Sequence, residues 1–189
     1  VEAIKDKHLF RPFLGNELKT WRPWISALRV LYGLRLSQYD QDRVQGCTGR
    51  NPSGMPANGF DNALFLTGRR SGKSRIASVI GAFEAVLAGH EDRLSRGEQG
   101  VVAVCAPTKH QSQVVKGYLR AVFDCGILGH EVQSDRSDGF QLNNGNRIAI
   151  LAGDWRTIRG FTLIAAIVDE ACFFGCDAES KVRSDTELV

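Results

Sequence analysis

The fold is decided by one stretch, Thr67-Gly68-Arg69-Arg70-Ser71-Gly72-Lys73-Ser74, which lies between a short apolar run and a helical pattern. The apolar run, residues 63–66, predicts a strand, and the pattern from Lys73 to Ala88 repeats apolar residues at helical spacing. Phosphate binding needs backbone N–H groups at the start of a helix and a glycine where a side chain would collide with the anion. The order of strand, loop and helix therefore predicts a phosphate-binding loop.

The residues of this loop have separate expected roles toward a nucleoside triphosphate. We expect Lys73 to reach the β- and γ-phosphate oxygens and the Ser74 hydroxyl to coordinate Mg²⁺. The other expected phosphate contacts are Gly68, Arg69, Arg70, Ser71 and Gly72. Thr67 stands where the usual pattern has a glycine, so the assignment depends on the strand and the helix around the loop.

An acidic pair, Asp169-Glu170, follows the continuous apolar run Leu163–Val168. A run without alternation is typical of a strand buried on both faces of a parallel sheet. Such a strand delivers its terminal carboxylates to the sheet edge where ligands of open α/β sheets bind. We expect Asp169 to hold Mg²⁺ through water and Glu170 to orient and deprotonate the attacking water. An exposed strand-end pair would be the better interpretation only without the phosphate loop.

The rest of the chain alternates between strands and helices, which predicts an α/β fold with a mainly parallel sheet flanked by helices. We expect a strand at 101–106 and a helix at 109–123, with Val114, Val115, Leu119 and Val122 facing inward. A hairpin is expected from strands at 140–142 and 147–151 around the turn 143–146.

The N-terminal part predicts helix over residues 17–46, because apolar residues recur there at spacings of three and four. A Gly-, Pro- and Asn-rich loop follows at 46–59. We therefore expect a helical N-terminal segment at 1–58 and an α/β core at 59–189.

Composition limits the class of protein. The chain has 189 residues, 43% of them hydrophobic and 24% charged, and a net charge of +3, which is typical of a globular, mildly basic protein. We expect neither a membrane span nor a signal peptide, hence an intracellular protein. Five scattered cysteines favour reduced thiols, and plain packing is a better interpretation of Cys172 and Cys176 than metal binding.

Four motifs together resemble the successive ATPase motifs of phage terminase large subunits. They are Gly68–Ser74, Ala106-Pro107-Thr108, Ile158-Arg159-Gly160 and Ile167-Val168-Asp169-Glu170-Ala171. The resemblance implies an ASCE-type P-loop NTPase fold that uses ATP and Mg²⁺ to drive double-stranded DNA into a capsid in the host cytoplasm. It also implies a homo-oligomeric ring, with the portal and the small terminase subunit as partners. The sequence ends before the coupling motif and nuclease domain of that family, so we expect a truncated motor fragment.

The resemblance implies three further roles. Arg69 would point at the phosphates, although solvated loop cations are the alternative for Arg69 and Arg70. Arg159 would offer an arginine finger to a neighbouring subunit, with Arg156 as a local rival and a structural pair as the alternative. The segment Trp21–Trp24 would contribute to the adenine pocket.

Two other functions remain open from the sequence. A helicase-like translocase also carries an element similar to Ala106-Pro107-Thr108 after a strand. A nucleotide-binding ring-assembly module would bind ATP without hydrolysis. Lys109, Lys116 and Arg120 share a helix and are candidates for a DNA path, although a solvated helix face explains them equally well.

Overall fold

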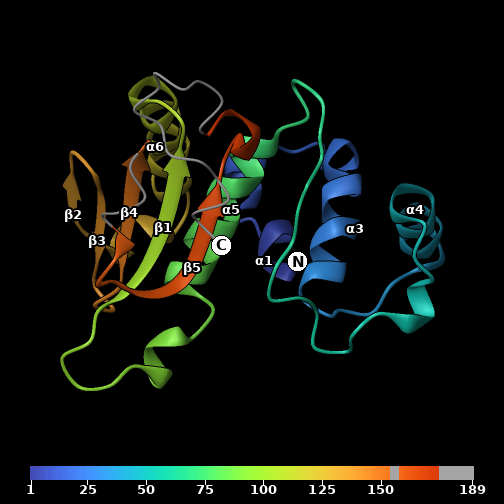
Figure 1. The fold of residues 1–189 in the computed structure, drawn as a ribbon, viewed down its shortest axis with the longest axis horizontal. Coiled ribbons are helices and arrows are strands. Elements are labelled where there is room, and N and C mark those ends of the chain that lie inside the picture. The colour runs from blue at the N-terminus through green and yellow to red at the C-terminus, as the bar shows by residue number, and fades with distance from the viewer. Residues whose placement is uncertain (154–157, 175–189) are drawn as a thin grey trace. The chain divides into compact units, whose positions relative to one another are not determined.

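A computed structural model describes residues 1–153 and 158–174, and the chain divides into two compact units, Val1–Ser71 and Gly72–Val189 (Figure 1). The boundary between the units falls inside the predicted phosphate loop, between Ser71 and Gly72. Each unit is described below by itself.

The first unit is helical. Its elements are α1 (Glu2–Lys5), α2 (Arg11–Leu14), η1 (Leu18–Trp21), α3 (Arg22–Leu31), α4 (Gln38–Thr48) and η2 (Pro52–Gly54). The expected helix over 17–46 is divided, because the chain turns at Gly33 with φ 62°. A Cβ atom on Gly33 would lie 2.3 Å from the Ala57 carbonyl oxygen, so the turn also requires the absence of a side chain.

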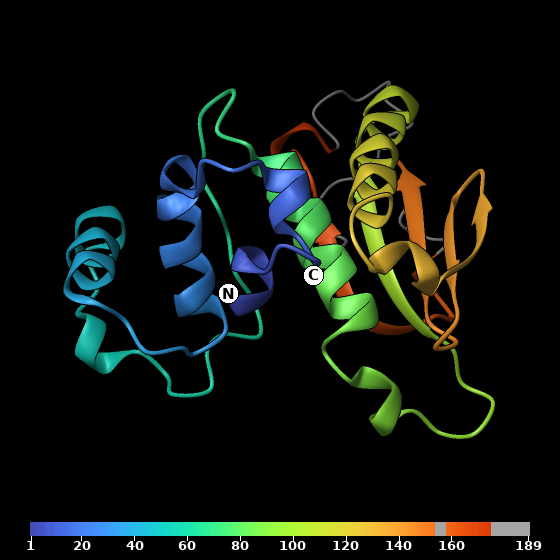
Figure 2. The ribbon, with the colours of Figure 1, turned by 180° about the vertical axis from the view of Figure 1, so that it is seen from behind.

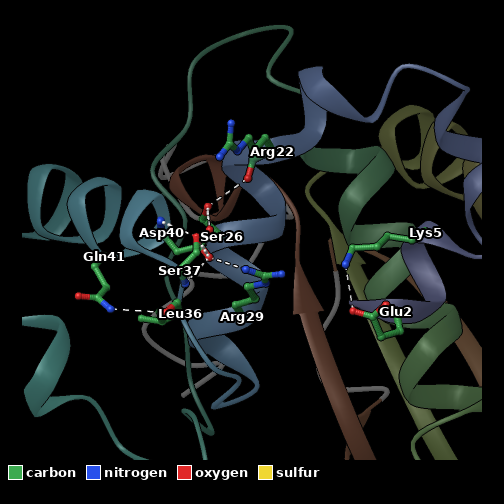
Figure 3. Close-up of polar contacts among 9 residues, drawn as sticks. All are labelled: Glu2, Lys5, Arg22, Ser26, Arg29, Leu36, Ser37, Asp40 and Gln41. Carbon is green, nitrogen blue, oxygen red and sulfur yellow. Dashed lines mark hydrogen bonds and ion pairs between the residues drawn. The ribbon is translucent and has the colours of Figure 1, made fainter.

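The junction between α3 and α4 contains a buried carboxylate, Asp40 (Figure 3). Its oxygens accept hydrogen bonds from Ser26 Oγ at 2.5 Å and from Ser37 Oγ at 2.7 Å, and they pair with Arg29 Nη1 at 2.5 Å. Ser37 and Asp40 also form a capping box at the start of α4. Burial opposes ionisation of Asp40, but the hydrogen bonds outweigh it and hold the pKa of the carboxyl well below its usual range.

The segment that follows η2 runs along α3. The Phe60 amide donates to the Leu31 carbonyl at 2.9 Å, and the rings of Phe65 and Trp24 have centroids 5.5 Å apart. The predicted strand at 63–66 is therefore wrong: these residues are irregular, and Leu64 and Leu66 are 78% and 87% exposed. A four-residue apolar run becomes a strand only where another strand supplies hydrogen bonds, and here Phe65 packs against a helix instead.

The second unit contains a five-stranded mixed sheet in the order β2-β3-β4-β1-β5 (Figure 1). Its strands are β1 (Gly100–Ala106), β2 (Val132–Arg136), β3 (Gly139–Leu142), β4 (Arg147–Ala152) and β5 (Thr162–Val168). β1 pairs in parallel with both β4 and β5, whereas β3 is antiparallel to β2 and β4. The expected α/β class and the expected hairpin are confirmed. The sheet is mixed, because the hairpin of β3 and β4 is one antiparallel pair and the unpredicted β2 adds a second.

Two long helices, α5 (Lys73–Val86) and α6 (Lys109–Phe123), pack on each other and on the same face of this sheet (Figure 2). Both lie where the apolar spacing predicts them. Val115, Leu119 and Val122 of α6 are buried as expected, but Val114 is 45% exposed. Val114 precedes Val115 by one residue, which turns it about 100° away from the packed face. Short 3-10 turns complete the unit at His90–Arg93, Leu128–Glu131 and Ala171–Phe173.

The position of β5 in the sheet corrects a second expectation. β1 is buried along its whole length, but β5 stands at the end of the strand order, and Leu163 and Val168 are 43% and 37% exposed. Among the described strands, this apolar run without alternation thus forms the last strand of the sheet order, and it is not buried on both faces.

The turn between β3 and β4 holds the C-terminal end of α5. The side-chain amides of Asn144 and Asn146 both donate to the Ala85 carbonyl at 2.9 Å. The last carbonyls of a helix have no N–H partner within the helix, and the two asparagine amides supply N–H partners for the carbonyl of Ala85. The asparagines that predict the turn therefore also bind the C-terminal end of α5, the helix that begins at Lys73. No helix in the described ranges 1–153 and 158–174 has the length and apolar character needed to cross a bilayer.

Candidate active site

The candidate site lies at the start of α5. Gly72 precedes the helix with φ 82°, a left-handed conformation that favours glycine, and Lys73 is the first helical residue. The first N–H groups of a helix have no carbonyl partner within it, so they attract an anion. This glycine is therefore required by the backbone at the place where the sequence predicts phosphate binding.

The end of β5 brings Asp169 to this helix. The Asp169 amide donates to the Cys105 carbonyl at 2.9 Å, which extends the pairing of β5 with β1 by one residue. The Ser74 hydroxyl then donates to Asp169 Oδ2 at 2.9 Å, although the two residues are far apart in sequence. Two residues that the sequence assigns to one magnesium ion are thus direct neighbours.

Glu170 lies beside Asp169 but has a different backbone conformation. Its φ and ψ are 54° and 45°, a left-handed region that non-glycine residues rarely occupy. Its Oε1 lies 3.2 Å from Lys73 Nζ, and its Oε2 accepts a hydrogen bond from the side-chain amide of Gln111. Lys73, Ser74, Asp169 and Glu170 therefore form one polar cluster at the carboxyl edge of β1 and β5.

Gln111 is a member of this cluster that the sequence analysis did not identify. It stands in the first turn of α6, where the capping residue Thr108 accepts a hydrogen bond from the Gln111 amide at 3.2 Å and donates to Gln111 Oε1 at 3.0 Å. The remaining Gln111 Nε2 group is thereby directed at Glu170. A threonine followed three residues later by glutamine is a known signature of a helix start, and it was the available signal.

The oxygen atoms present fit a magnesium ion. Mg²⁺ is bound through one or two carboxylates together with hydroxyls, waters and substrate phosphates, and all of these are hard oxygen ligands. Ser74 and Asp169 supply one hydroxyl and one carboxylate within hydrogen-bond distance of each other. No group of three or more His, Cys, Asp or Glu side chains suitable for a metal occurs among residues 1–153 and 158–174.

A comparison with models of protein families shows which family the chain belongs to. The model of the family described as "Terminase large subunit, T4likevirus-type, N-terminal" matches residues 64–187, which include the whole cluster. The chain belongs to this terminase family. Comparisons with curated proteins and with solved structures gave no match.

The remaining loop residues of this terminase chain belong to the first unit. Gly68, Arg69 and Arg70 are exposed, and Arg70 has φ 62°, so the loop contains a left-handed non-glycine residue two positions before Gly72. The Ser71 carbonyl accepts a hydrogen bond from Trp24 Nε1 at 2.7 Å. Trp24 comes from the segment that resembles the adenine-pocket region of the terminases, and here it contacts Ser71 of the predicted phosphate loop.

Other predicted residues lie outside the cluster. Arg159 is exposed in the segment before β5, and Arg156 and Cys176 lie outside the described residues. Lys116 Nζ lies 2.9 Å from Asp135 Oδ1 and Arg120 also pairs with Asp135, so this acidic residue of β2 partly neutralises the candidate DNA path. Cys105 is buried in β1, and burial raises the pKa of its thiol to about 11, whereas Cys172, for which packing was expected, is exposed.

Proposed function

We propose that this terminase chain is a Mg²⁺-dependent ATPase with a P-loop fold of the ASCE type, and that its hydrolysis of ATP drives double-stranded DNA into a viral capsid. The observation that carries the proposal is the contact of Lys73 and Ser74, at the start of α5, with Glu170 and Asp169, at the end of β5. Membership of the terminase large-subunit family points to a role in viral DNA packaging and supports DNA as the cargo.

The side chains divide the chemistry as follows. Lys73 supplies a positive charge to the β- and γ-phosphate oxygens, and the N–H groups at the start of α5 add hydrogen bonds. Ser74 and Asp169 would hold Mg²⁺. When bound, the ion would offset part of the negative charge of the phosphates. Glu170 accepts the proton of the water that attacks the γ-phosphorus, and Gln111 holds the Glu170 carboxylate in place.

The edge of the sheet explains why the side chains with these roles lie together. Parallel strands end at the same edge, and ligands of α/β sheets bind there beside helix N-termini. β1 and β5 are parallel, with a register shift between Val101 and Val102, and they pair as far as Cys105 and Val168, so Asp169 and the segment that leads from Ala106 to Thr108 lie at one edge. The motif Ala106-Pro107-Thr108 is thus explained as the connection that places Gln111 against Glu170.

Replacement of Lys73 by alanine tests the proposal. The full 189-residue chain should bind ATP with Mg²⁺, and Lys73→Ala should lose most of this binding, because the other donors of the loop are mostly backbone groups. Lys109→Ala is the matched control, since Lys109 is an exposed lysine at the start of the other long helix, α6. Titration calorimetry measures both. Equal affinity of Lys73→Ala and the unaltered chain would remove the phosphate-loop assignment.

Phosphate release at saturating ATP separates the proposed ATPase from a module that binds ATP without hydrolysis. A DNA-unwinding assay separates it from a helicase-like translocase, which would separate the strands of a duplex, whereas a packaging motor moves the duplex intact. Phosphate release without unwinding is the expected result.

A further inference from the structure

Trp24 connects α3 to the phosphate loop. Its indole Nε1 donates to the Ser71 carbonyl at 2.7 Å, across 47 positions of sequence and within one compact unit. The Trp24 side chain is only 9% exposed, and its ring packs on Phe65 with centroids 5.5 Å apart. A buried indole N–H requires an acceptor, and here the acceptor is a backbone carbonyl of the loop.

The Ser71 carbonyl is a sensitive point in that loop. Ser71 stands between Arg70 and Gly72, which both have positive φ, and two residues before Lys73. A phosphate loop works only if its N–H groups point toward the anion and its carbonyl groups point away, because a carbonyl oxygen repels phosphate. The Ser71 carbonyl shares its peptide plane with the Gly72 N–H, so a hydrogen bond that holds this carbonyl also fixes the direction of that N–H.

The alternative for Trp24 is a direct contact with the base of the nucleotide, as the resemblance of this segment to the adenine-pocket region implies. The described contacts favour the loop over the base, because the polar atom of the indole is already bonded to Ser71 and the ring already packs on Phe65. Ser71 and Phe65 both belong to the segment 55–71 that runs along α3. The Phe60 amide of the same segment donates a hydrogen bond to the Leu31 carbonyl of α3.

We propose that Trp24 is a positioning residue for phosphate binding: its indole N–H fixes the Ser71 carbonyl so that the following N–H groups and Lys73 are oriented toward a polyphosphate. The inference rests on the proposed function, because it assumes that the loop binds phosphate. It predicts that Trp24 affects the affinity for the polyphosphate group whether or not a base is attached.

The test replaces Trp24 by phenylalanine, which keeps an aromatic ring against Phe65 and removes the N–H donor. The ligands are Mg²⁺ with ATP and Mg²⁺ with inorganic tripolyphosphate, each titrated into the full 189-residue chain. Loss of one hydrogen bond that orients the loop should weaken both ligands by the same factor, about 3- to 10-fold. In turnover, KM for ATP should rise while kcat changes little.

Thr48→Val is the matched control. The Thr48 hydroxyl donates to the Val44 carbonyl at 2.7 Å, so the substitution removes a hydrogen bond from a side chain to a backbone carbonyl in the same unit, at a place with no assigned role in binding. Thr48→Val should leave both affinities within twofold of those of the unaltered chain. Equal losses in the two variants would mean a general loss of folding and would overturn the proposal.

Three other results would also overturn it, and they are distinguishable. Weaker binding of ATP alone in Trp24→Phe would assign Trp24 to the base. Unchanged binding of both ligands would show that the hydrogen bond to Ser71 has no effect on the loop. If the unaltered chain bound neither ligand, the proposed function itself would fail, and the role of Trp24 would fall with it.

A second measurement does not depend on the stability of Trp24→Phe. In nitrogen-15 spectra of the protein, the indole resonances are assigned by elimination with Trp21→Phe and Trp155→Phe. Addition of Mg²⁺ and tripolyphosphate should shift the Trp24 Nε1–H resonance and leave that of Trp21 in place, because only the acceptor of Trp24 belongs to the loop. An unmoved Trp24 resonance at saturating ligand would contradict the proposal.

Discussion

Lys73 Nζ lies 3.2 Å from Glu170 Oε1, so the lysine assigned to phosphate and the carboxylate assigned to water are in contact. Their side chains are 33% and 27% exposed, and an ion pair so accessible to solvent contributes little to stability. The ion pair matters for ligand binding instead, because a triphosphate and the Glu170 carboxylate both attract the ammonium group of Lys73. Lys73 has three N–H donors, which allows it to serve both.

Glu170→Gln should therefore separate binding from hydrolysis. The amide keeps the shape of the side chain but removes both the proton acceptor and the charge that attracts Lys73. ATP affinity should stay equal or rise, while phosphate release at saturating ATP should fall about 100-fold or more. Calorimetry and a phosphate-release assay measure the two quantities. Glu98→Gln, on the exposed loop before β1, is the control. Undiminished turnover in Glu170→Gln would remove Glu170 as the base.

Gln111→Ala should lower the turnover rate and leave ATP affinity nearly unchanged. Gln111 contacts Glu170 and Thr108, so its loss frees the carboxylate without removing a contact assigned to phosphate. We expect kcat to fall about 3- to 10-fold at a similar KM, as for the loss of one orienting hydrogen bond. Gln113→Ala, an exposed glutamine on the same helix, is the control. An increase in KM at constant kcat would argue against this positioning role.

Asp40→Asn should destabilise the helical unit by about 3 kcal/mol at pH 7, because Arg29 would lose its partner in a buried site. The folded-state pKa of Asp40 lies below its unfolded value, so its charge stabilises the fold above pH ~4. This stabilisation is lost as the pH falls from about 4 toward the folded-state pKa.

Denaturant unfolding between pH 3 and 7 checks the prediction for Asp40. The difference in unfolding free energy between the unaltered chain and Asp40→Asn should shrink as the pH falls below about 4. Asp42→Asn, at an exposed position of the same helix, should show no such convergence. A constant difference across this range would mean that Asp40 stabilises the unit through something other than its charge.

Arg159 should complete the site of a neighbouring subunit, as the resemblance to terminases implies. A guanidinium offers several donors to the negative charge that develops on the transferring phosphoryl group. In an assembled ring of the intact large subunit, Arg159→Ala and Glu170→Ala should each abolish hydrolysis. Mixing the two variants should restore some activity, because some interfaces then join an intact Glu170 site to an intact Arg159. Mixed rings that form but stay inactive would exclude action in trans.

Local sequence patterns were sufficient for many elements of this terminase chain. The apolar spacing predicts α5 and α6, and the Asn-rich turn predicts the hairpin of β3 and β4. These features depend on hydrogen bonds and contacts between near neighbours. The placement of Asp169 and Glu170 at a strand end, and of Lys73 at a helix start, follows from the same local rules.

Only the tertiary structure decided which of these elements meet. The apolar run at 63–66 packs along α3 instead of forming a strand, and the run at 163–168 stands at the end of the sheet order. An apolar composition favours the burial of a segment, but strand pairing depends on partner strands elsewhere in the chain. A sequence window does not contain those partners.

The same distinction holds for the site. The sequence by itself placed Lys73 and Ser74 at a helix start and Asp169 and Glu170 at a strand end, because residue type and local spacing carry those signals. The contacts of Gln111 with Glu170, 59 positions away, and of Trp24 with Ser71, 47 positions away, come from the tertiary structure alone. The physical reason is that a side-chain hydrogen bond needs two groups within about 3 Å, and only the folded chain brings such distant residues that close.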